Sequence, residues 1–336
     1  MAILINPFRF AADESSWVEL GRSAVSSGSD IDVTVTARDN MMVIEHIVAS
    51  GNIDQGMHFN DDGGGGGSSN YAWRVRRDGS VTGQGINTYR FNTEESYPVT
   101  ALEIYYLQHT NGQDKITRWY DTQANGTGAT NIPVTCEGVG KWGITSDITK
   151  VSFTNIDSGS YASGSEVIVL GYDNDEAAGG TPFWEELASV ELGGAGDLSS
   201  GTITAKKNLW LQIYSTTGTS ADDLLRFNSD TGTNYTDRRR TDNASEATAT
   251  SQTSILNTMN NNATTPAFGN YFIQNILGQE KLVSGFINQQ LTAGATNPAS
   301  RIEVSGKWVN TSAQITNITL GGTIGAGSIM KVWGAD

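Results

Sequence analysis

The chain has 336 residues, of which 17% are charged, and its formal net charge at pH 7 is −15. An acidic balance of this size argues against a nucleic-acid-binding role, because a basic face is needed to neutralise phosphates and release counterions. The single cysteine, Cys136, excludes an intrachain disulfide. We therefore expect synthesis in a reducing cytoplasm, with Cys136 packed as a small apolar side chain.

An apolar and aromatic leader, residues 1–16, opens the chain with the stretch ILINPFRF. Burying each large apolar side chain is worth about 1.5–3 kcal/mol, so we do not expect this stretch to stay in water. It could fold back onto the first domain, or it could lie on a partner with Pro7 holding it extended. We favour the partner, which makes these the expected partner-binding residues: Ile3, Leu4, Ile5, Pro7, Phe8 and Phe10. The leader has no basic region typical of a secretory signal, and no segment of the chain reaches the length of a membrane-spanning helix.

Short strand patterns follow the leader. Asp30–Ala37 (DIDVTVTA) alternates polar and apolar residues with period two, as a half-buried strand does. Four more stretches are rich in β-branched or aromatic residues and also predict strands. They are 41–50 (MMVIEHIVAS), 71–77 (YAWRVRR), 101–109 (ALEIYYLQH) and 165–172 (SEVIVLGY).

A run of five glycines, Gly63–Gly67, interrupts this series within FNDDGGGGGSSNY. Far downstream, residues 227–235 read FNSDTGTNY, with the same flanks and a middle that is four residues shorter. The run lacks the Lys-Ser/Thr ending of a phosphate-binding loop. It is therefore interpreted as an expanded loop in one of two related copies.

Further matches in the same order establish an internal repeat. WVEL corresponds to WEEL, TARDN to TAKKN, GQDKI to GQEKL, and GKW occurs in both halves. Such self-similarity indicates duplication of one structural unit. The expected organisation is a leader (1–16), a first domain (17–173), an acidic, Gly-rich linker (174–183) and a second domain (184–336). The second domain supplies strand patterns at 208–215 (NLWLQIYS), 270–277 (NYFIQNIL) and 328–334 (SIMKVWG).

The fold class expected from these patterns is all-β, with two tandem, duplicated β-sandwich domains of jelly-roll-like kind. Each copy has about eight to ten predicted strands, a number typical of a two-sheet sandwich. FWEELASVEL (183–192) is the one stretch that could be a helix. Its counterpart SWVELGRSAV is no better as a helix, so both are predicted to be strands.

Few residues suggest catalysis. The three histidines, His46, His58 and His109, lie in predicted strands without zinc-site spacing, and adjacent carboxylates such as Asp61–Asp62 would point to opposite faces of a strand. DNDE (173–176) has oxygen ligands suited to calcium but not the spacing of a calcium-binding loop. We expect no catalytic residue, no cofactor and no metal ion. The short basic cluster Arg238–Arg240 is expected to be a solvated or ion-paired face.

Several polar and aromatic residues recur at equivalent places in the two copies. Trp142 and Trp308, each after Gly-Lys, are expected to pack between two sheets; the alternative is a stacking platform for a sugar ring. The asparagines have ordinary hairpin-turn roles, or they could donate hydrogen bonds to a glycan. The recurring pairs are Asn60 and Asn228, Tyr71 and Tyr235, Lys141 and Lys307, and Trp142 and Trp308.

NPFRF near the start, the FN-D-G-NY…R hairpins and the closing GKW…TS…I and GS…V.G.D blocks resemble virion proteins of environmental tailed bacteriophages. The resemblance implies a non-enzymatic protein of the virion, synthesised in the host cytoplasm. A capsid decoration or cement protein that binds the major capsid protein is the first expectation, as a homo-oligomer such as a trimer. The alternative is a tail-fibre or receptor-binding module that recognises host glycans.

Overall fold

A computed structural model describes residues 17–63, 69–92, 100–174, 181–216, 223–242, 244, 246–257, 266–290, 294–295 and 298–336. The leader, with its expected partner-binding residues, lies outside these ranges, as do Gly64–Gly67 and residues 175–180 of the linker. All regular structure in the described ranges is β-strand. They contain no helix that is long and apolar enough to cross a membrane.

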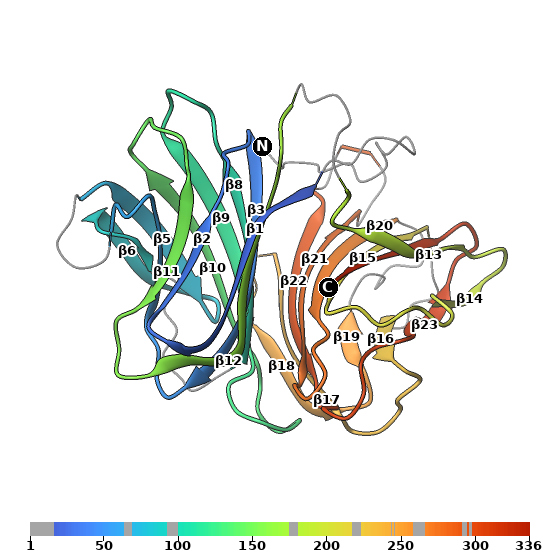
Figure 1. Cartoon of the computed structure of the whole chain (residues 1–336). Coiled ribbons are helices and arrows are strands. Elements are labelled where there is room, and N and C mark those ends of the chain that lie inside the picture. Colours follow the sequence, from blue (N-terminus) through green and yellow to red (C-terminus); the bar gives the residue numbers. More distant parts are fainter. Residues whose placement is uncertain are drawn as a thin grey trace.

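The first sandwich, called sandwich 1 below, pairs an eight-stranded with a four-stranded antiparallel sheet (Figure 1). The large sheet has the order β1 (Val18–Gly28), β12 (Ser160–Tyr172), β3 (Asn40–Ser50), β8 (Thr100–Gln108), β9 (Lys115–Gln123), β10 (Val134–Trp142), β5 (Tyr71–Arg77) and β6 (Ser80–Thr88). The small sheet has the order β2 (Asp30–Thr34), β11 (Lys150–Asn155), β4 (Gln55–Phe59) and β7 (Phe91–Asn92).

Sandwich 2 repeats this topology strand for strand, each strand standing twelve places later in the chain. Its large sheet has the order β13 (Glu185–Glu191), β24 (Ile329–Ala335), β15 (Asn208–Ser215), β20 (Ala267–Gln274), β21 (Lys281–Gln289), β22 (Ser300–Trp308), β17 (Tyr235–Thr241) and β18 (Ala247–Gln252). Its small sheet has the order β14 (Gly196–Ser199), β23 (Ile318–Ile324), β16 (Asp223–Phe227) and β19 (Ile255–Asn257).

The predicted fold class, all-β with two tandem sandwiches, is therefore confirmed, and so is the assignment of both WVEL and WEEL to strands (β1 and β13). The chain passes back and forth between the two sheets, as in jelly-roll sandwiches. The expected number of eight to ten strands was too low. Each sandwich has twelve in the described residues, because short strands such as β7 and β19 carry too few residues to show a period of two.

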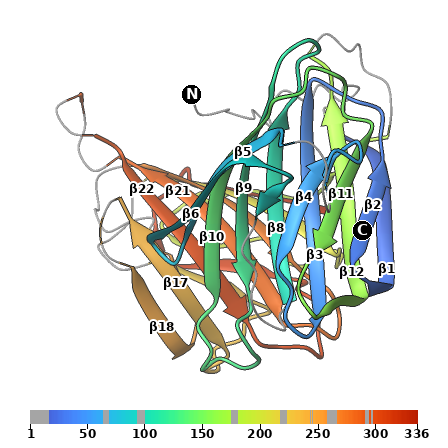
Figure 2. The same ribbon diagram turned by 90° about the vertical axis from the view of Figure 1, so that its left-hand side faces the viewer.

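The two large sheets face each other across the middle of the molecule, which Figure 1 and the rotated view in Figure 2 both show. Each large sheet is thus covered by its small sheet on one side and by the other sandwich on the other side. That explains the continuous apolar run of β3, which is buried on both of its faces. Apolar residues of both sandwiches form one cluster between the large sheets, including Met42, Ile44, Leu102, Ile104, Trp184, Trp210, Phe272 and Leu282.

Equivalent positions of the two sandwiches touch across this joint. The rings of Tyr120 and Phe286, which occupy the same place in β9 and β21, have centroids 3.9 Å apart. Tyr106 and Phe272, equivalent in β8 and β20, are 6.4 Å apart. Contacts between identical places are the mark of a two-fold relation, so the sandwiches meet about an approximate local two-fold axis, as the subunits of a symmetric dimer do.

Candidate functional sites: the joint and an exposed sheet face

The tryptophans of the two GKW motifs are core residues, each 1% exposed. The indole Nε1 of Trp142 donates a hydrogen bond to Asp62 (2.6 Å), and that of Trp308 donates to Asp230 (2.7 Å). The packing interpretation is confirmed, and the alternative of a sugar-stacking platform is wrong, because no ring face is available to a ligand. The aspartates in turn hold the hairpin that carries them, through hydrogen bonds donated by Asn70 and Asn234.

The recurring asparagines fasten one loop to another. The side-chain oxygen of Asn60 accepts hydrogen bonds from the backbone N–H groups of Thr149 (2.8 Å) and Lys150 (3.1 Å). Asn228 accepts equivalent bonds from Thr316 (2.8 Å) and Asn317 (3.1 Å). Their side-chain amides donate to the carbonyl oxygens of Asp147 and Gln314. These polar groups are therefore used within the fold and are not directed at a glycan.

The repeated GQDKI and GQEKL motifs contain a buried lysine that the sequence did not single out. Lys115 Nζ donates to the backbone carbonyls of Gln113 (2.6 Å) and Thr145 (3.2 Å). Lys281 Nζ donates to those of Gln279 (2.6 Å), Ile276 (3.0 Å) and Asn310 (3.0 Å). Burial lowers the pKa of both lysines, that of Lys281 to about 8. The recurrence of Lys at the same place in both motifs was the sequence signal that could have indicated a structural role for this residue.

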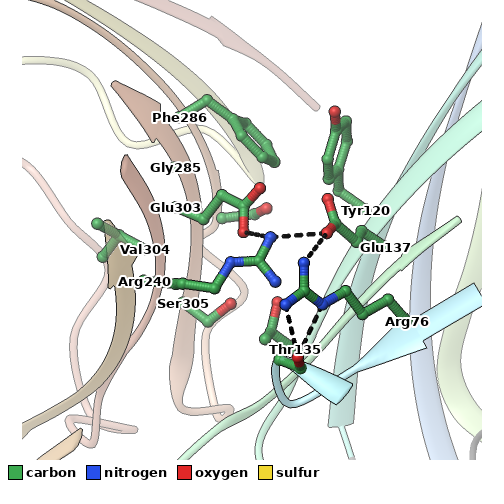
Figure 3. A pocket seen from close by; sticks show the side chains of 12 residues that line it. Arg76, Tyr120, Thr135, Glu137, Arg240, Gly285, Phe286, Glu303, Val304 and Ser305 are labelled. Carbon is green, nitrogen blue, oxygen red and sulfur yellow. Dashed lines mark hydrogen bonds and ion pairs between the residues drawn. The ribbon is translucent and has the colours of Figure 1, made fainter. Parts of the chain in front are cut away.

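An ion cluster lies at the joint between the sandwiches (Figure 3). The buried guanidinium of Arg240 contacts Glu303 of its own sandwich (2.5 Å) and Glu137 of the other (2.8 Å). Arg76 approaches Glu137 at 4.0 Å. Arg76 and Arg240 occupy equivalent places in β5 and β17, and Glu137 and Glu303 in β10 and β22, so the cluster follows the local two-fold axis.

The remaining arginines of the basic cluster are also paired. Arg239 lies 2.8 Å from Asp237, and Arg238 pairs with Asp78 of sandwich 1 (3.2 Å) and with Glu246. The expectation that Arg238–Arg240 forms an ion-paired face is confirmed. Two of the three arginines pair across the joint, which sequence distance alone could not indicate.

The two carboxylates of the joint titrate differently. Burial and the neighbouring Glu137 carboxylate raise the pKa of Glu303 to about 7. Burial also disfavours the charge on Glu137, but the hydrogen bond and charge of Arg240 bring its pKa below the ordinary value. The cavity beside them, lined by Tyr120 and Phe286, has a volume of about 20 Å³, which suits one water molecule and not a substrate. The cluster is thus suited to joining two sheets.

Replacing Arg240 by alanine should therefore weaken the joint. The change leaves two partly buried carboxylates facing each other without their shared cation, which should cost less than the roughly 3–5 kcal/mol typical of a fully buried pair. We expect faster limited proteolysis and a larger radius of gyration in solution scattering. Lys150→Ala is the control, because Lys150 pairs with Asp32 on the small sheet of sandwich 1 and with Asp61 in the turn after β4. Unchanged proteolysis and scattering for Arg240→Ala would show that apolar packing alone holds the sandwiches together.

Three carboxylic acids lie in a row inside sandwich 1. Glu45, Glu103 and Asp121 are direct cross-strand neighbours on β3, β8 and β9, and all are buried. Gln55 donates to Glu45 (2.8 Å), and the Tyr105 hydroxyl donates to Glu103. The backbone N–H of Cys136 (2.6 Å) and the side-chain amide of Gln123 (2.9 Å) donate to Asp121.

Burial dominates the ionisation of this row. It raises the pKa of Glu45, with the Glu103 carboxylate adding to the effect, and it raises the pKa of Glu103 together with Asp121. Burial raises the pKa of Asp121 to about 7, against the hydrogen bonds from Gln123 and Cys136. The equivalent positions of sandwich 2 are Ile213, Gly269 and Ile287. The acids are therefore a feature of sandwich 1 alone, and sequence reasoning missed them.

The histidines have structural surroundings. His46 Nε2 lies 2.6 Å from the Asn208 side-chain oxygen across the joint, and burial lowers its pKa. His58 contacts Thr154 (3.1 Å), and His109 lies 3.2 Å from Asp147. In the part of the chain that the structure describes, no group of three or more His, Cys, Asp or Glu side chains is arranged to hold a metal ion. In the DNDE stretch, Asp173 pairs with Arg38 (2.6 Å), and Asp175 and Glu176 lie outside the described residues.

Beside the joint row of Tyr120, Glu137 and Arg76, the same face of the large sheet of sandwich 1 has exposed side chains on β9, β10, β5 and β6 in the described residues. Two cross-strand rows of side chains lie there. One row contains Arg118, Val139, Arg74 and Gln84, and the other contains Ile116, Lys141, Ala72 and Ile86. We call these eight residues the open face. Three of its aliphatic side chains are well exposed: Ile116 (58%), Val139 (51%) and Ile86 (78%).

No family model and no curated protein matches the chain. Among solved structures, domains LG4-5 of the mouse laminin alpha1 chain align over 95% of this chain and 90% of their own, with 11% identity and a TM-score of 0.19. The attachment invasion locus protein Ail of Yersinia pestis aligns over 81% and 99%, with 6% identity and a TM-score of 0.14. The mavirus major capsid protein aligns over 97% and 88%, with 6% identity and a TM-score of 0.16. These likenesses are too weak to carry an argument about fold or role.

Proposed function

We propose that the protein is a non-enzymatic structural protein of a bacteriophage virion, and in particular a decoration or cement protein bound to the capsid shell. The observation that carries the proposal is the use of the repeated polar residues. In both sandwiches the Asp–Trp bonds, the asparagine bonds and the buried lysines fasten loops to sheets. Groups that could otherwise bind or transform a small molecule hold a rigid body together.

The joint supports the same conclusion. Apolar packing of the large sheets and the Arg240 ion cluster fasten the two sandwiches to each other. A decoration protein needs a rigid outer body and a surface that recognises its particle. We propose the major capsid protein as partner, the virion as location, and a homo-oligomer as the bound form. The leader residues Ile3–Phe10 are the proposed anchor.

The test uses purified particles. Stained gels should show this chain in hundreds of copies per particle, and electron microscopy should place it on the outer surface of the shell. Protein added to particles that lack it should restore the decoration, and a chain without residues 2–12 should fold but fail to bind. Full decoration by the shortened chain would remove the leader from the proposal. Absence of the protein from particles would refute the virion role.

A tail-fibre or receptor-binding module that recognises host glycans is the alternative, and copy number separates the two, since a fibre needs few chains per particle. The burial of Trp142 and Trp308 removes the sugar-stacking platform that favoured it. We therefore place the capsid role first.

A further inference from the structure

The cavity at the joint is lined by side chains that can donate hydrogen bonds to an anion. Its volume is about 20 Å³, which is room for one ion or molecule of the size of water. The guanidinium groups of Arg76 in sandwich 1 and Arg240 in sandwich 2 point toward each other there (Figure 3). Thr135, Ser284 and Ser305, which carry hydroxyl groups, also line the cavity. The whole lining belongs to the described part of the chain.

Arg240 carries a buried hydrogen-bond donor that the described residues leave without a partner. Its ion pairs with Glu137 (2.8 Å) and Glu303 (2.5 Å) are both made by one atom, Nη2. Its Nε is buried and has no hydrogen-bond partner in the described residues. Burying a donor without an acceptor is costly, above all when the donor is charged. An acceptor held in the cavity would remove this cost.

Two further side chains of the lining have donors beside the cavity. Ser305 is buried and accepts a hydrogen bond from the Thr122 hydroxyl (3.0 Å), so its own hydroxyl proton remains to be donated to another acceptor. Arg76 donates from Nε (2.8 Å) and Nη2 (2.6 Å) to the carbonyl oxygen of Gly79. Its remaining nitrogen, Nη1, lies 4.0 Å from Glu137, which is beyond hydrogen-bond distance. Donors from both sandwiches therefore meet at the cavity.

Positive charge exceeds negative charge in this ion cluster. Glu137 is shared by Arg76 and Arg240. Glu303 is shared by Arg240 and Arg301. Three arginines thus share two carboxylates. Burial and the Glu137 carboxylate raise the pKa of Glu303 to about 7, so the negative charge is smaller still near neutral pH. A water-sized cavity with excess positive charge is suited to a small anion.

We propose that the cavity of the joint binds one small monovalent anion, of the size and charge of chloride, between Arg76 of sandwich 1 and Arg240 of sandwich 2. Phosphate and carboxylate anions are too large for a cavity that holds one water molecule. The ion separates two guanidinium groups of like charge and is bound by both sandwiches. It therefore stabilises the joined form according to its occupancy. The inference does not depend on the virion role, because it concerns the free chain.

The melting temperature of the full chain in sodium chloride tests the proposal. It should rise with chloride concentration and then level off as the site fills. Sodium gluconate at the same ionic strength should raise it less, because gluconate screens charges equally but does not fit the cavity. Arg76→Gln should lose the difference between the two salts. Arg74→Gln is the matched control and should keep it, since Arg74 lies on the same strand, β5, but does not line the cavity.

Crystals of the wild type grown in sodium bromide locate the ion, because bromide scatters anomalously. One anomalous peak should lie in the cavity, between Arg76 and Arg240. Equal melting temperatures of the wild type in the two salts overturn the proposal, as does a folded Arg76→Gln variant that keeps the difference between them. Bromide peaks confined to other places also overturn it. If Arg76→Gln does not fold, the wild-type salt comparison and the bromide map still decide, since each can refute the site alone.

Discussion

Alanine in place of Trp308 should lower the stability of sandwich 2 by about 3–5 kcal/mol, the usual cost of removing a buried tryptophan. The indole stacks on Tyr235 with centroids 6.3 Å apart and packs on Phe227 at 5.8 Å. It also donates to Asp230, whose pKa this bond lowers against the effect of burial. The loss is a large share of the roughly 5–15 kcal/mol that stabilises a domain.

The free energy of unfolding from chemical denaturation, and the melting temperature from calorimetry, check this expectation. Trp142→Ala should have the same effect in sandwich 1, where the indole packs on Tyr71 and Phe59. Trp73→Ala is the control, because Trp73 is only half-buried and should cost less. Losses below about 1 kcal/mol for both GKW variants would contradict the core role assigned to these residues.

Stability should fall as the pH rises from about 5 to about 8, because of the row of buried acids in sandwich 1 and of Glu303 at the joint. The pKa of Asp121 is about 7 in the folded protein, and those of Glu45 and Glu103 are also raised. An unfolded carboxyl group loses its proton near pH 4, whereas these groups keep theirs when folded. The stabilisation is fully present below the unfolded pKa and is lost as the pH rises through the folded pKa.

Each such group should contribute a slope of up to about 1.4 kcal/mol per pH unit. The double variant Glu103→Gln, Asp121→Asn removes two of the titrating groups and should flatten the profile of melting temperature against pH. Asp157→Asn, at an exposed carboxyl, should leave the slope unchanged. The three histidines, whose pKa values burial lowers, oppose this trend below about pH 7, and Lys281 opposes it from near pH 8. Equal slopes for the wild type and the double variant would show that these acids do not control the profile.

The fold could be predicted from the sequence because its signals are local or repeated. Alternation in β2, apolar runs in β3 and β8, and matched GKW motifs each follow from a few neighbouring residues. Because the two halves are duplicates, each strand predicted in one half also predicted the equivalent strand in the other half. The same comparison correctly predicted that the two GKW tryptophans are core residues and not a binding platform. A residue that recurs in both copies is expected to stabilise the fold that both copies share.

The joint and the acid row could not be predicted because they depend on contacts across the chain. Arg240 meets Glu137 over a separation of 103 residues. Glu45, Glu103 and Asp121 lie on three strands far apart in the sequence, and only the register of those strands places them together inside. One side of β20 and β21 packs on the other sandwich. Their apolar residues do not indicate, from the sequence alone, which surface covers them.

The two buried lysines have a consequence for the surroundings that the protein tolerates. Backbone carbonyl oxygens are also calcium ligands in proteins, and a calcium ion must be drawn from solution. Here the Nζ atoms of Lys115 and Lys281 supply the positive charge from within the chain. Because this cation is covalently tethered, it cannot be removed by a chelator or exchanged as the ionic composition changes. Below the lowered pKa values of these lysines, both loop corners should therefore keep their shape in the presence of a chelator.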